Sequence, residues 1–407
     1  MSALVVALRT WAVRAGFLVG CRRPLRPRVV LATSHAAALS GNLAFIAEEL
    51  AARHPTVPLT VLAFRHGPGL RGRLRAVVHA ARSGYHLATA RAFVVDDYFF
   101  PMYVIRPRPG TVRVQVWHAA GAFKKFGYSV VDKSFGADEE LLRQVAIHSN
   151  YSLALVSSMT AAPHYAEAFG QPRAIFASRF GLPRTDLFFD EQRRARALAR
   201  IRDRYRLPDG RRVVLYAPTF RGDSVVTARY DDLLDLRVMH EVLGDDVVVL
   251  LRLHPFIRTA LAIPPDLSGF ALDASADPDL NELMLVSDVL VTDYSSAIYE
   301  FALLGRPILF LAPDDAAYER ERGFYLEFPG DLPGPVFAST RDLAEAIRAG
   351  AFDLERVRAF ARASFDVTDG RATARLVDGV LLPALEGRAP VGDGASGGRR
   401  RPAPSVS

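Results

Sequence analysis

A junction between a strand and a helix in this chain carries several hydroxyl and acidic side chains. The apolar run over residues 289–291 predicts a buried strand, and a helical pattern follows over 297–304. The first N–H groups of a helix lack intrahelical partners, and the helix dipole favours negative charge there. The junction is therefore a candidate anion site, although helix capping by the same side chains is the alternative. The polar residues at this junction are Thr292, Asp293, Ser295 and Ser296.

Two further strand ends carry cationic side chains. Arg252 and His254 alternate at the end of an apolar run that Pro255 terminates, so both side chains are expected on one face. Thr219 and Arg221 follow another apolar run, and the planar fork of an arginine suits a phosphate group. For Arg252 and His254 the alternative is an ion pair with a nearby acid, and for Arg221 it is a surface position.

One histidine is placed to move a proton. Trp117 and His118 follow an apolar run directly, and a loop of small residues then leads to Lys124 and Lys125. The pKa of histidine suits proton abstraction near neutrality, and the lysines would face phosphate. A histidine satisfied by loop carbonyls, with solvated lysines, is the alternative. Glu300, one turn inside the candidate helix over 297–304, would bind ribose hydroxyls, and a solvated or core-edge glutamate is the alternative.

The elements that position these residues alternate between strands and helices, which predicts an α/β fold with parallel sheets. A chain of 407 residues suits two domains. We expect two Rossmann-like domains facing across a cleft, with ligands beyond the carboxyl ends of the strands. Expected strands are 29–33, 59–64, 92–95, 112–116, 153–157, 213–217, 247–251, 270–272, 289–291 and 308–311. Expected helices are 42–53, 70–82, 191–205, 297–304, 343–364 and 371–385.

The positive charge of the chain is concentrated at its two ends. Residues 1–28 carry six arginines and no acid, and residues 399–401 add three arginines, while the whole chain has a net charge of +7. The body between is therefore nearly neutral, and no nucleic-acid partner is expected. We expect a basic N-terminal segment over 1–28, domains over 29–188 and 189–385, and a disordered basic tail over 386–407.

The N-terminal segment has apolar residues at helical spacing, with Arg9 and Arg14 off that face. It is either an amphipathic helix on an anionic membrane, or a disordered or core-packed N-terminus. No uninterrupted run approaches the ~20 apolar residues of a membrane span. The single cysteine, Cys21, excludes an internal disulfide and favours a reducing compartment.

Several common sites have no counterpart in this sequence. It contains no Walker-type loop, no Gly-x-Gly-x-x-Gly after a strand, and no Cys/His cluster with zinc spacing. The pair Asp277 and Asp279 flanks a proline in a loop, which makes a poor metal site. No metal and no cofactor are therefore expected.

Taken together, the order and spacing of these motifs resemble the CDP-glycerol glycerophosphotransferase family, whose members build teichoic-acid-like poly(polyol phosphate) on a membrane lipid. The resemblance extends from about residue 30 to 385. It is carried by Trp117-His118 with Lys124 and Gly127, by 181–186, by Tyr216 to Arg221, by Arg252 to Pro255, by 288–296, by 306–310 and by Asp369 to Ala372.

The resemblance implies a two-domain glycosyltransferase-B-like fold, with the acceptor on the N-terminal domain and the CDP-linked donor on the C-terminal domain. His118 would deprotonate the acceptor hydroxyl, which attacks the distal phosphorus while CMP leaves. In the absence of a metal, arginines, histidines and helix N–H groups must meet the charge of the transferring group. By this resemblance the catalytic residues are His118 and His254, and the donor-binding residues are Lys124, Thr219, Arg221, Arg252, Thr292, Asp293, Ser295, Ser296 and Glu300.

The sequence departs from the family pattern just after the histidine. Ala119 stands where many members have glycine, and Lys124 falls one residue later than usual. The expected reaction is transfer of glycerol phosphate from CDP-glycerol to a lipid-linked polyol phosphate acceptor, on the cytoplasmic face of the cell membrane. CDP-ribitol as donor, a sugar-nucleotide glycosyltransferase and a catalytically inactive binding subunit stay open as alternatives.

Overall fold

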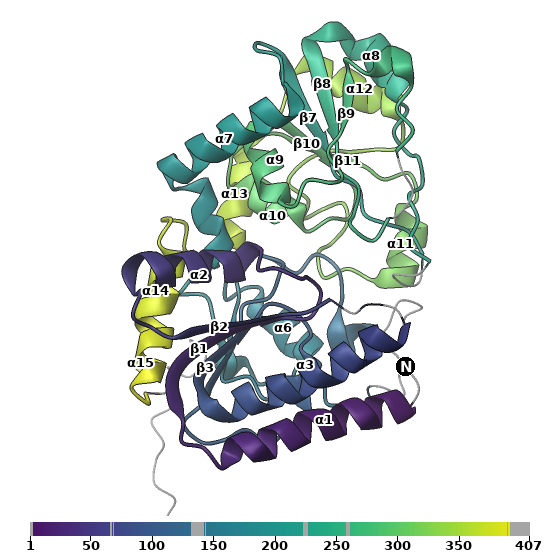
Figure 1. Cartoon of the computed structure of the whole chain (residues 1–407). Coiled ribbons are helices and arrows are strands. Elements are labelled where there is room, and N and C mark those ends of the chain that lie inside the picture. Colours follow the sequence, from purple (N-terminus) through teal and green to yellow (C-terminus); the bar gives the residue numbers. More distant parts are fainter. Residues whose placement is uncertain are drawn as a thin grey trace, which may run out of the picture. The chain divides into compact units, whose positions relative to one another are not determined.

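The computed structural model describes residues 3–65, 67, 69–131, 142, 144–222, 227–257, 261–388 and 390. The chain forms two compact units, each built on a six-stranded parallel sheet (Figure 1). The predicted α/β class with two parallel-sheet domains is thereby confirmed. The first unit comprises Met1–Trp117, Gln144–Gly181 and Ala374–Ser407, and the second comprises His118–Arg143 and Leu182–Thr373.

These units are interleaved along the chain, whereas the ranges expected from the sequence were continuous. The segment that begins at His118 packs with the second unit, and the last helices pack with the first. Most of the C-terminal tail that was predicted to be disordered lies outside the described residues.

The sheet of the first unit has the strand order β2-β1-β3-β4-β5-β6, with every pair parallel. Its central strands are buried along most of their length, as parallel strands are when helices cover both faces. The strands are β1 (Arg26–Thr33), β2 (Leu59–Ala63), β3 (Ala90–Val95), β4 (Val112–Gln115), β5 (Leu153–Leu155) and β6 (Phe176–Ala177). The helices are α1 (Ala3–Cys21), α2 (Gly41–Arg53), α3 (Gly69–Thr89), α4 (Phe100–Tyr103), α6 (Ala162–Phe169) and α15 (Leu382–Leu385), which a π-helical turn (Val377–Leu381) joins to α14 (Ala372–Leu376).

The sheet of the second unit has the order β12-β11-β10-β7-β8-β9, again with every pair parallel. Its strands are β7 (Arg212–Tyr216), β8 (Val247–Leu251), β9 (Ala271–Asp273), β10 (Val289–Thr292), β11 (Ile308–Leu311) and β12 (Val336–Phe337). Its helices are α7 (Glu191–Tyr205), α8 (Leu236–Leu243), α9 (Leu280–Val286), α10 (Ala297–Ala302), α11 (Asp315–Arg322), α12 (Thr340–Ala349) and α13 (Leu354–Ser364).

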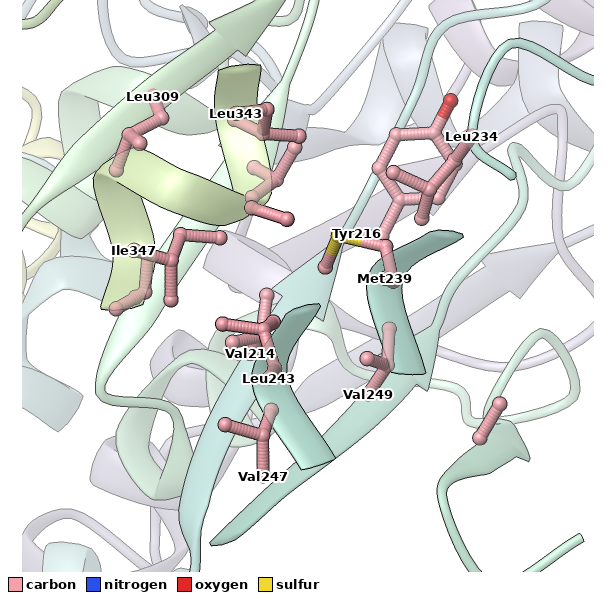
Figure 2. Close-up of a cluster of buried hydrophobic side chains, with 14 of the residues drawn as sticks. Val214, Tyr216, Leu234, Met239, Leu243, Val247, Val249, Leu309, Leu343 and Ile347 are labelled. Carbon is pink, nitrogen blue, oxygen red and sulfur yellow. The ribbon is translucent and has the colours of Figure 1, made fainter. Parts of the chain in front are cut away.

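Figure 2 shows how alternate side chains of this second sheet build a core with helices α8 and α12. Val214 and Tyr216 point from β7 toward Met239 on α8, and Leu343 and Ile347 on α12 complete the layer. All five side chains are buried. Because successive strand residues point to opposite faces, the residues between them on β7 pack on the other side of the sheet.

Most predicted elements are present, but the single helix expected over 343–364 is two helices. α12 ends at Gly350, whose φ of +67° places it in the left-handed region that favours glycine at a helix C-cap. The side chain of Asp353 then accepts a hydrogen bond from the N–H of Arg356 and starts α13. The two-residue strands β6 and β12 were not predicted, because runs so short carry no periodicity.

The strand order of each sheet reverses once. In the first unit, β1 is followed along the chain by β2 on one side and then by β3 on the other. In the second unit, β7 has β8 on one side and β10 on the other. The loops that leave such neighbouring strands diverge, and ligands in open parallel sheets bind beyond the carboxyl ends at this position. The β1/β3 and β7/β10 strand ends are therefore the first places to look for chemistry.

The N-terminal segment forms helix α1, which lies side by side with α3 (Figure 1). Small residues allow the two backbones to approach closely, since a Cβ on Gly84 would lie 2.0 Å from the carbonyl oxygen of Val13. Val13 and Phe17 are buried while Leu4 and Trp11 are exposed, so α1 is both packed against the unit and apolar outside. The prediction of an N-terminal helix is confirmed, and core packing, offered as its alternative, occurs as well.

By length and composition, Leu4–Cys21 would suffice to cross a membrane, with a mean hydropathy of 1.5 and 28% of the segment buried in the unit. The sequence-based expectation that no segment reaches this length is corrected here. It counted only uninterrupted apolar runs, whereas the helix continues through Arg9 and Arg14. The guanidinium of Arg14 donates to the carbonyl of Val104 at 2.9 Å, and that of Arg9 lies over the ring of Phe100.

Gly84→Ala is expected to destabilise the protein by about 1–3 kcal/mol, because the added methyl group overlaps the α1 backbone. Thermal unfolding of the full chain measures this loss. Gly269→Ala is the matched control, because nothing lies within 4 Å of a Cβ at that position. Equal melting temperatures for both variants would contradict the close packing of α1 on α3.

Candidate active site

A buried carboxylate joins two loops at the β7/β10 strand ends of the second unit. Asp293, which follows β10 and is 1% exposed, accepts hydrogen bonds from the backbone N–H of Thr219 at 2.8 Å and from its hydroxyl at 2.9 Å. Its other donors are the guanidinium of Arg221 at 2.8 Å and the N–H of Tyr294 at 2.7 Å. Asp293 therefore fixes the loop after β7 to the end of β10. Beside it, the hydroxyl of Thr292 donates to the carbonyl of Ala217 at 2.6 Å.

Arg221 is held between two carboxylates inside this unit. It pairs with Asp293 and, at 2.8 Å, with Asp314, which also accepts from the hydroxyl of Tyr294 at 2.8 Å. Burial lowers the pKa of Arg221, but the two carboxylates outweigh it and raise that pKa above its ordinary value. The guanidinium is thus part of an internal ion-pair network. Its contact with a pyrophosphate stays a prediction.

The helix junction that follows β10 is largely used by the protein itself. The hydroxyl of Ser295 accepts from the N–H of Ala297 at 3.2 Å, so it caps the short helix α10. Ser296 is half-buried and makes no capping bond through its side chain. Glu300, predicted to bind ribose hydroxyls, is 1% exposed and forms an ion pair with Arg184. Helix capping, the alternative offered for the serines of this junction, describes Ser295 in this structure. The contact of Glu300 with a ribose stays a prediction, and its buried ion pair with Arg184 was not foreseen in the sequence.

In contrast, Arg252 carries a charge that no described acid neutralises by a direct ion pair. It follows β8, is 8% exposed, and donates to the carbonyl of Leu253. Its Nε is buried and has no hydrogen-bond partner among the described residues. Burial lowers the pKa of Arg252, and the more distant carboxylates of Asp277 and its neighbours only oppose that effect. A buried guanidinium with an unused donor is a site for an anion.

His254 lies beside this guanidinium as a neutral hydrogen-bond donor. Its Nδ1 accepts from the backbone N–H of Phe256 at 3.2 Å, so the ring hydrogen is on Nε2. Burial, and then the positive charges of Lys124, Arg252 and other nearby cations, lower the pKa of His254 to about 3. At neutral pH the free edge of this imidazole therefore presents an N–H group beside a cluster of cations.

Lys124 reaches this cluster because its segment pairs with residues 323–325 of the same unit. Lys124 forms an antiparallel bridge with Phe324, and its Nζ donates to the hydroxyl of Tyr318 at 3.2 Å. A Cβ on Gly121 would lie 2.2 Å from the ring of Tyr299, so the loop needs glycine for this close approach. His118, Lys124 and Arg252 all lie close enough to His254 for their positive charge to lower its pKa. Four residues that the sequence analysis singled out are therefore near one another.

His118 itself is exposed, and the backbone just before it is strained. Trp117 has a φ of +49°, which a bulky residue rarely adopts. Two side chains of the first unit hold it: Asn42 donates to the Trp117 carbonyl at 2.7 Å, and Gln115 accepts from its N–H at 2.8 Å. Strain of this kind persists only where the surroundings maintain it, and it often marks a functional segment.

Two residues of this region were missed in the sequence. Arg322, at the end of α11, donates to the carbonyl of Gly222 at 2.7 Å and is among the cations that lower the pKa of His254. It lies in a charged helix with no distinguishing pattern. Asp314 comes shortly after the apolar strand β11. An acid just after an apolar run is also the pattern that singled out Asp293, so the sequence did contain a signal for Asp314.

Two of the motifs that carried the family resemblance, 181–186 and 369–372, meet in the second unit. The carboxylate of Asp186 accepts from the N–H groups of Ala372 and Thr373, both at 2.8 Å, and from the Thr373 hydroxyl at 2.6 Å. Asp186 therefore caps α14. These motifs support the framework of the unit.

The chain is similar to known proteins over most of its length. Residues 17–382 match the family described as CDP-Glycerol:Poly(glycerophosphate) glycerophosphotransferase. The chain is 39% identical over 353 residues to the teichoic acid ribitol-phosphate primase of Bacillus spizizenii, covering 86% of this chain and 90% of that protein. It is 32% identical over 257 residues to the teichoic acid glycerol-phosphate primase of the same organism, covering 63% and 65%.

Solved structures agree on the fold. The wall teichoic acid polymerase TagF, in a structure with CDPG, superposes with a TM-score of 0.77 at 23% identity, over 93% of this chain and 94% of that chain. A UDP-GlcNAc 2-epimerase from Neisseria meningitidis superposes with a TM-score of 0.53 at 12% identity, over 86% and 98%. Both likenesses support the two-domain glycosyltransferase-B-like fold that was predicted.

Asp293→Asn is expected to destabilise the protein by at least ~3 kcal/mol, because it removes a carboxylate that neutralises the buried Arg221. Urea-induced unfolding measures the change. Asp266→Asn serves as the control, since Asp266 pairs with Arg237 on the surface and little change is expected there. If both variants unfold at the same urea concentration, Asp293 is not the anchor of this site.

Proposed function

We propose that this chain transfers a polyol phosphate from a CDP-linked polyol to a hydroxyl of a lipid-linked acceptor. The chain belongs to the CDP-glycerol:poly(glycerophosphate) glycerophosphotransferase family. The family resemblance drawn from the motifs is confirmed by the match over residues 17–382. The enzyme class is therefore that of the teichoic acid glycerol- and ribitol-phosphate transferases.

The observation that supports this proposal is the buried guanidinium of Arg252, with which none of the described acids forms a direct ion pair. Arg252 has an unused buried donor, and Lys124 and Arg322 lie near enough to lower the pKa of His254. A pyrophosphate supplies the negative charge and the acceptor oxygens that such a group requires. CDP-linked polyols carry this pyrophosphate between the cytidine and the polyol.

The proposed chemistry assigns a role to each of these residues. The acceptor hydroxyl oxygen attacks the distal phosphorus, the bond from that phosphorus to the CMP oxygen breaks, and His118 takes the hydroxyl proton. His254 donates its Nε2 hydrogen to a phosphate oxygen, and Arg252 with Lys124 balances the charge that accumulates on the departing CMP. Charge stabilisation by fixed cations of this kind is a large part of phosphoryl-transfer catalysis.

From the sequence, we expect the transferred polyol to be glycerol. Ribitol is a second candidate, because the relative at 39% identity is a ribitol-phosphate primase whereas the glycerol-phosphate primase of the same organism is 32% identical. CMP release from CDP-glycerol and CDP-ribitol, assayed in parallel with each acceptor, distinguishes the two donors.

We also propose that helices α1 and α3 attach the enzyme to the cytoplasmic face of the cell membrane. Neither helix contains an acid, and α3 has exposed arginines along its length. The exposed apolar side chains on this pair favour an apolar boundary, and the arginines favour anionic lipid. Exposed apolar residues of the two helices are Leu4, Val5, Leu8, Trp11, Leu18, Val19, Leu74 and Val78.

His118→Ala is expected to reduce CMP release by at least ~100-fold while the CDP-linked donor still binds, because general-base catalysis contributes about 10²–10⁴-fold. Arg252→Gln is expected to weaken donor binding instead. Steady-state kinetics and calorimetric titration of both donors measure the two effects. Arg341→Gln, which removes a surface pair with Glu241, is the control. Transfer by His118→Ala at the wild-type rate would overturn the assignment of the base.

The double variant Trp11→Glu/Leu18→Glu is expected to bind vesicles containing phosphatidylglycerol at least ~10-fold more weakly, since each apolar side chain contributes about 1.5–3 kcal/mol on burial. Co-sedimentation at low salt measures this binding. Val61→Glu, at an exposed position of the same unit outside both helices, is the control. Equal binding by the double variant and the wild type would show that this surface is not the attachment site.

A further inference from the structure

A second cluster of titratable side chains lies at the carboxyl edge of the first sheet and belongs to the first unit. His35 follows β1, and Asp96 and Asp97 follow β3. These are the two neighbouring strands between which the strand order reverses. The fold thus places an imidazole and two carboxyl groups where open parallel sheets bind ligands.

The cluster is organised by contacts among its own members. Nδ1 of His35 lies 3.0 Å from Oγ1 of Thr33 and 3.3 Å from Oδ2 of Asp97. Nε2 of His35 lies 3.9 Å from Oδ2 of Asp96. The imidazole is thus oriented by the end of β1 and by the loop after β3. Because 44% of the His35 side chain stays exposed, a ligand can reach it.

Asp96 has an unfilled hydrogen-bonding position. Its side chain is 7% exposed, and its Oδ1 has no partner among the described residues, although such buried oxygens are normally hydrogen-bonded. Burial, together with the charge of Asp97, raises the pKa of Asp96 to about 6, against the opposing effects of His35 and Thr33. Leaving such an oxygen unpaired is unfavourable, and a bound hydrogen-bond donor would remove that cost.

We propose that this edge, formed by His35, Asp96 and Asp97, binds hydroxyl groups of the polyol on the acceptor. The inference rests on the proposed function and locates the subsite for its second substrate. A hydroxyl group both donates to a carboxyl oxygen and accepts from an imidazole N–H, so it matches this mixture of groups.

A phosphate group does not suit this cluster. It would face two carboxyl groups and one imidazole, and no arginine or lysine is among the groups that chiefly shift the pKa of Asp96. The donor site has the opposite composition, since cations surround His254. The carboxyl groups of this cluster therefore favour a neutral, hydroxyl-rich ligand, whereas the cations around His254 favour a pyrophosphate.

The cluster is also connected to the residue that precedes the predicted base. The carbonyl of Asp97 accepts from Nε2 of Gln115 at 3.1 Å, and Oε1 of Gln115 accepts from the N–H of Trp117 at 2.8 Å. Trp117 is the strained residue directly before His118. One side chain therefore supports both the hydroxyl-binding loop and the segment that presents His118.

The test uses the full chain and measures CMP release while the CDP-linked polyol and the lipid-linked acceptor are varied in turn. Asp96→Ala and His35→Gln are expected to raise the KM for the acceptor at least ~10-fold, as loss of about 1.4 kcal/mol implies, with the donor KM changed less than ~2-fold. His240→Gln, which removes an exposed histidine beside Asp245, is the matched control. If Asp96→Ala fails to fold, His35→Gln, an exposed position, decides the question.

An unchanged acceptor KM in His35→Gln, or an equal rise in both KM values, would overturn the subsite. If the wild type releases no CMP from either donor, the proposed function fails, and the subsite is tested by titrating free ribitol and glycerol. The NMR signal of the His35 ring, identified by its absence in His35→Gln, is expected to shift with saturation and to lose that response in Asp96→Ala. A signal that does not move would overturn the subsite independently of the reaction.

Discussion

The buried carboxylate of Asp293 is the interaction on which the second unit's site depends. It neutralises Arg221 and accepts three further hydrogen bonds from Thr219 and Tyr294, so it holds the loop after β7 to the end of β10. Breaking a buried pair of this kind leaves an uncompensated charge, which is far more costly than losing a surface pair. With these loops fixed, Arg252 and His254 extend from the next strand, β8, beside a rigid support.

The two sheets use the same topological position for different chemistry. In the second unit, the ends of β7 and β10 are closed by an internal network in which each charge has a partner. In the first unit, the ends of β1 and β3 leave a carboxyl oxygen of Asp96 without one. The first arrangement builds a framework, and the second leaves an unmet hydrogen bond for a ligand. A shared fold therefore does not imply a shared role, and the side chains at the strand ends decide it.

The sequence was sufficient to predict the parallel α/β fold and the strand ends, because apolar runs closed by polar residues mark them directly. It also singled out Lys124, Arg252 and His254, which the structure places near one another. It could not show that Arg221 would meet Asp314, 93 residues away, or that Glu300 would meet Arg184, 116 residues away. Local pattern contains no information on which acid lies opposite a strand end. Nor could it show that the segment after Trp117 packs with the second unit, since that depends on pairing with residues 323–325.

The central claim is that the cations around His254 bind the pyrophosphate of a CDP-linked donor, and a comparison of ligand affinities tests it most directly. Calorimetric titration of the wild-type chain with a CDP-linked polyol, CMP and cytidine isolates the contribution of each phosphate. The account predicts that affinity falls from the CDP-linked polyol to CMP and again to cytidine, with differences that shrink as salt is added. Equal affinities for the three ligands, independent of salt, would contradict it.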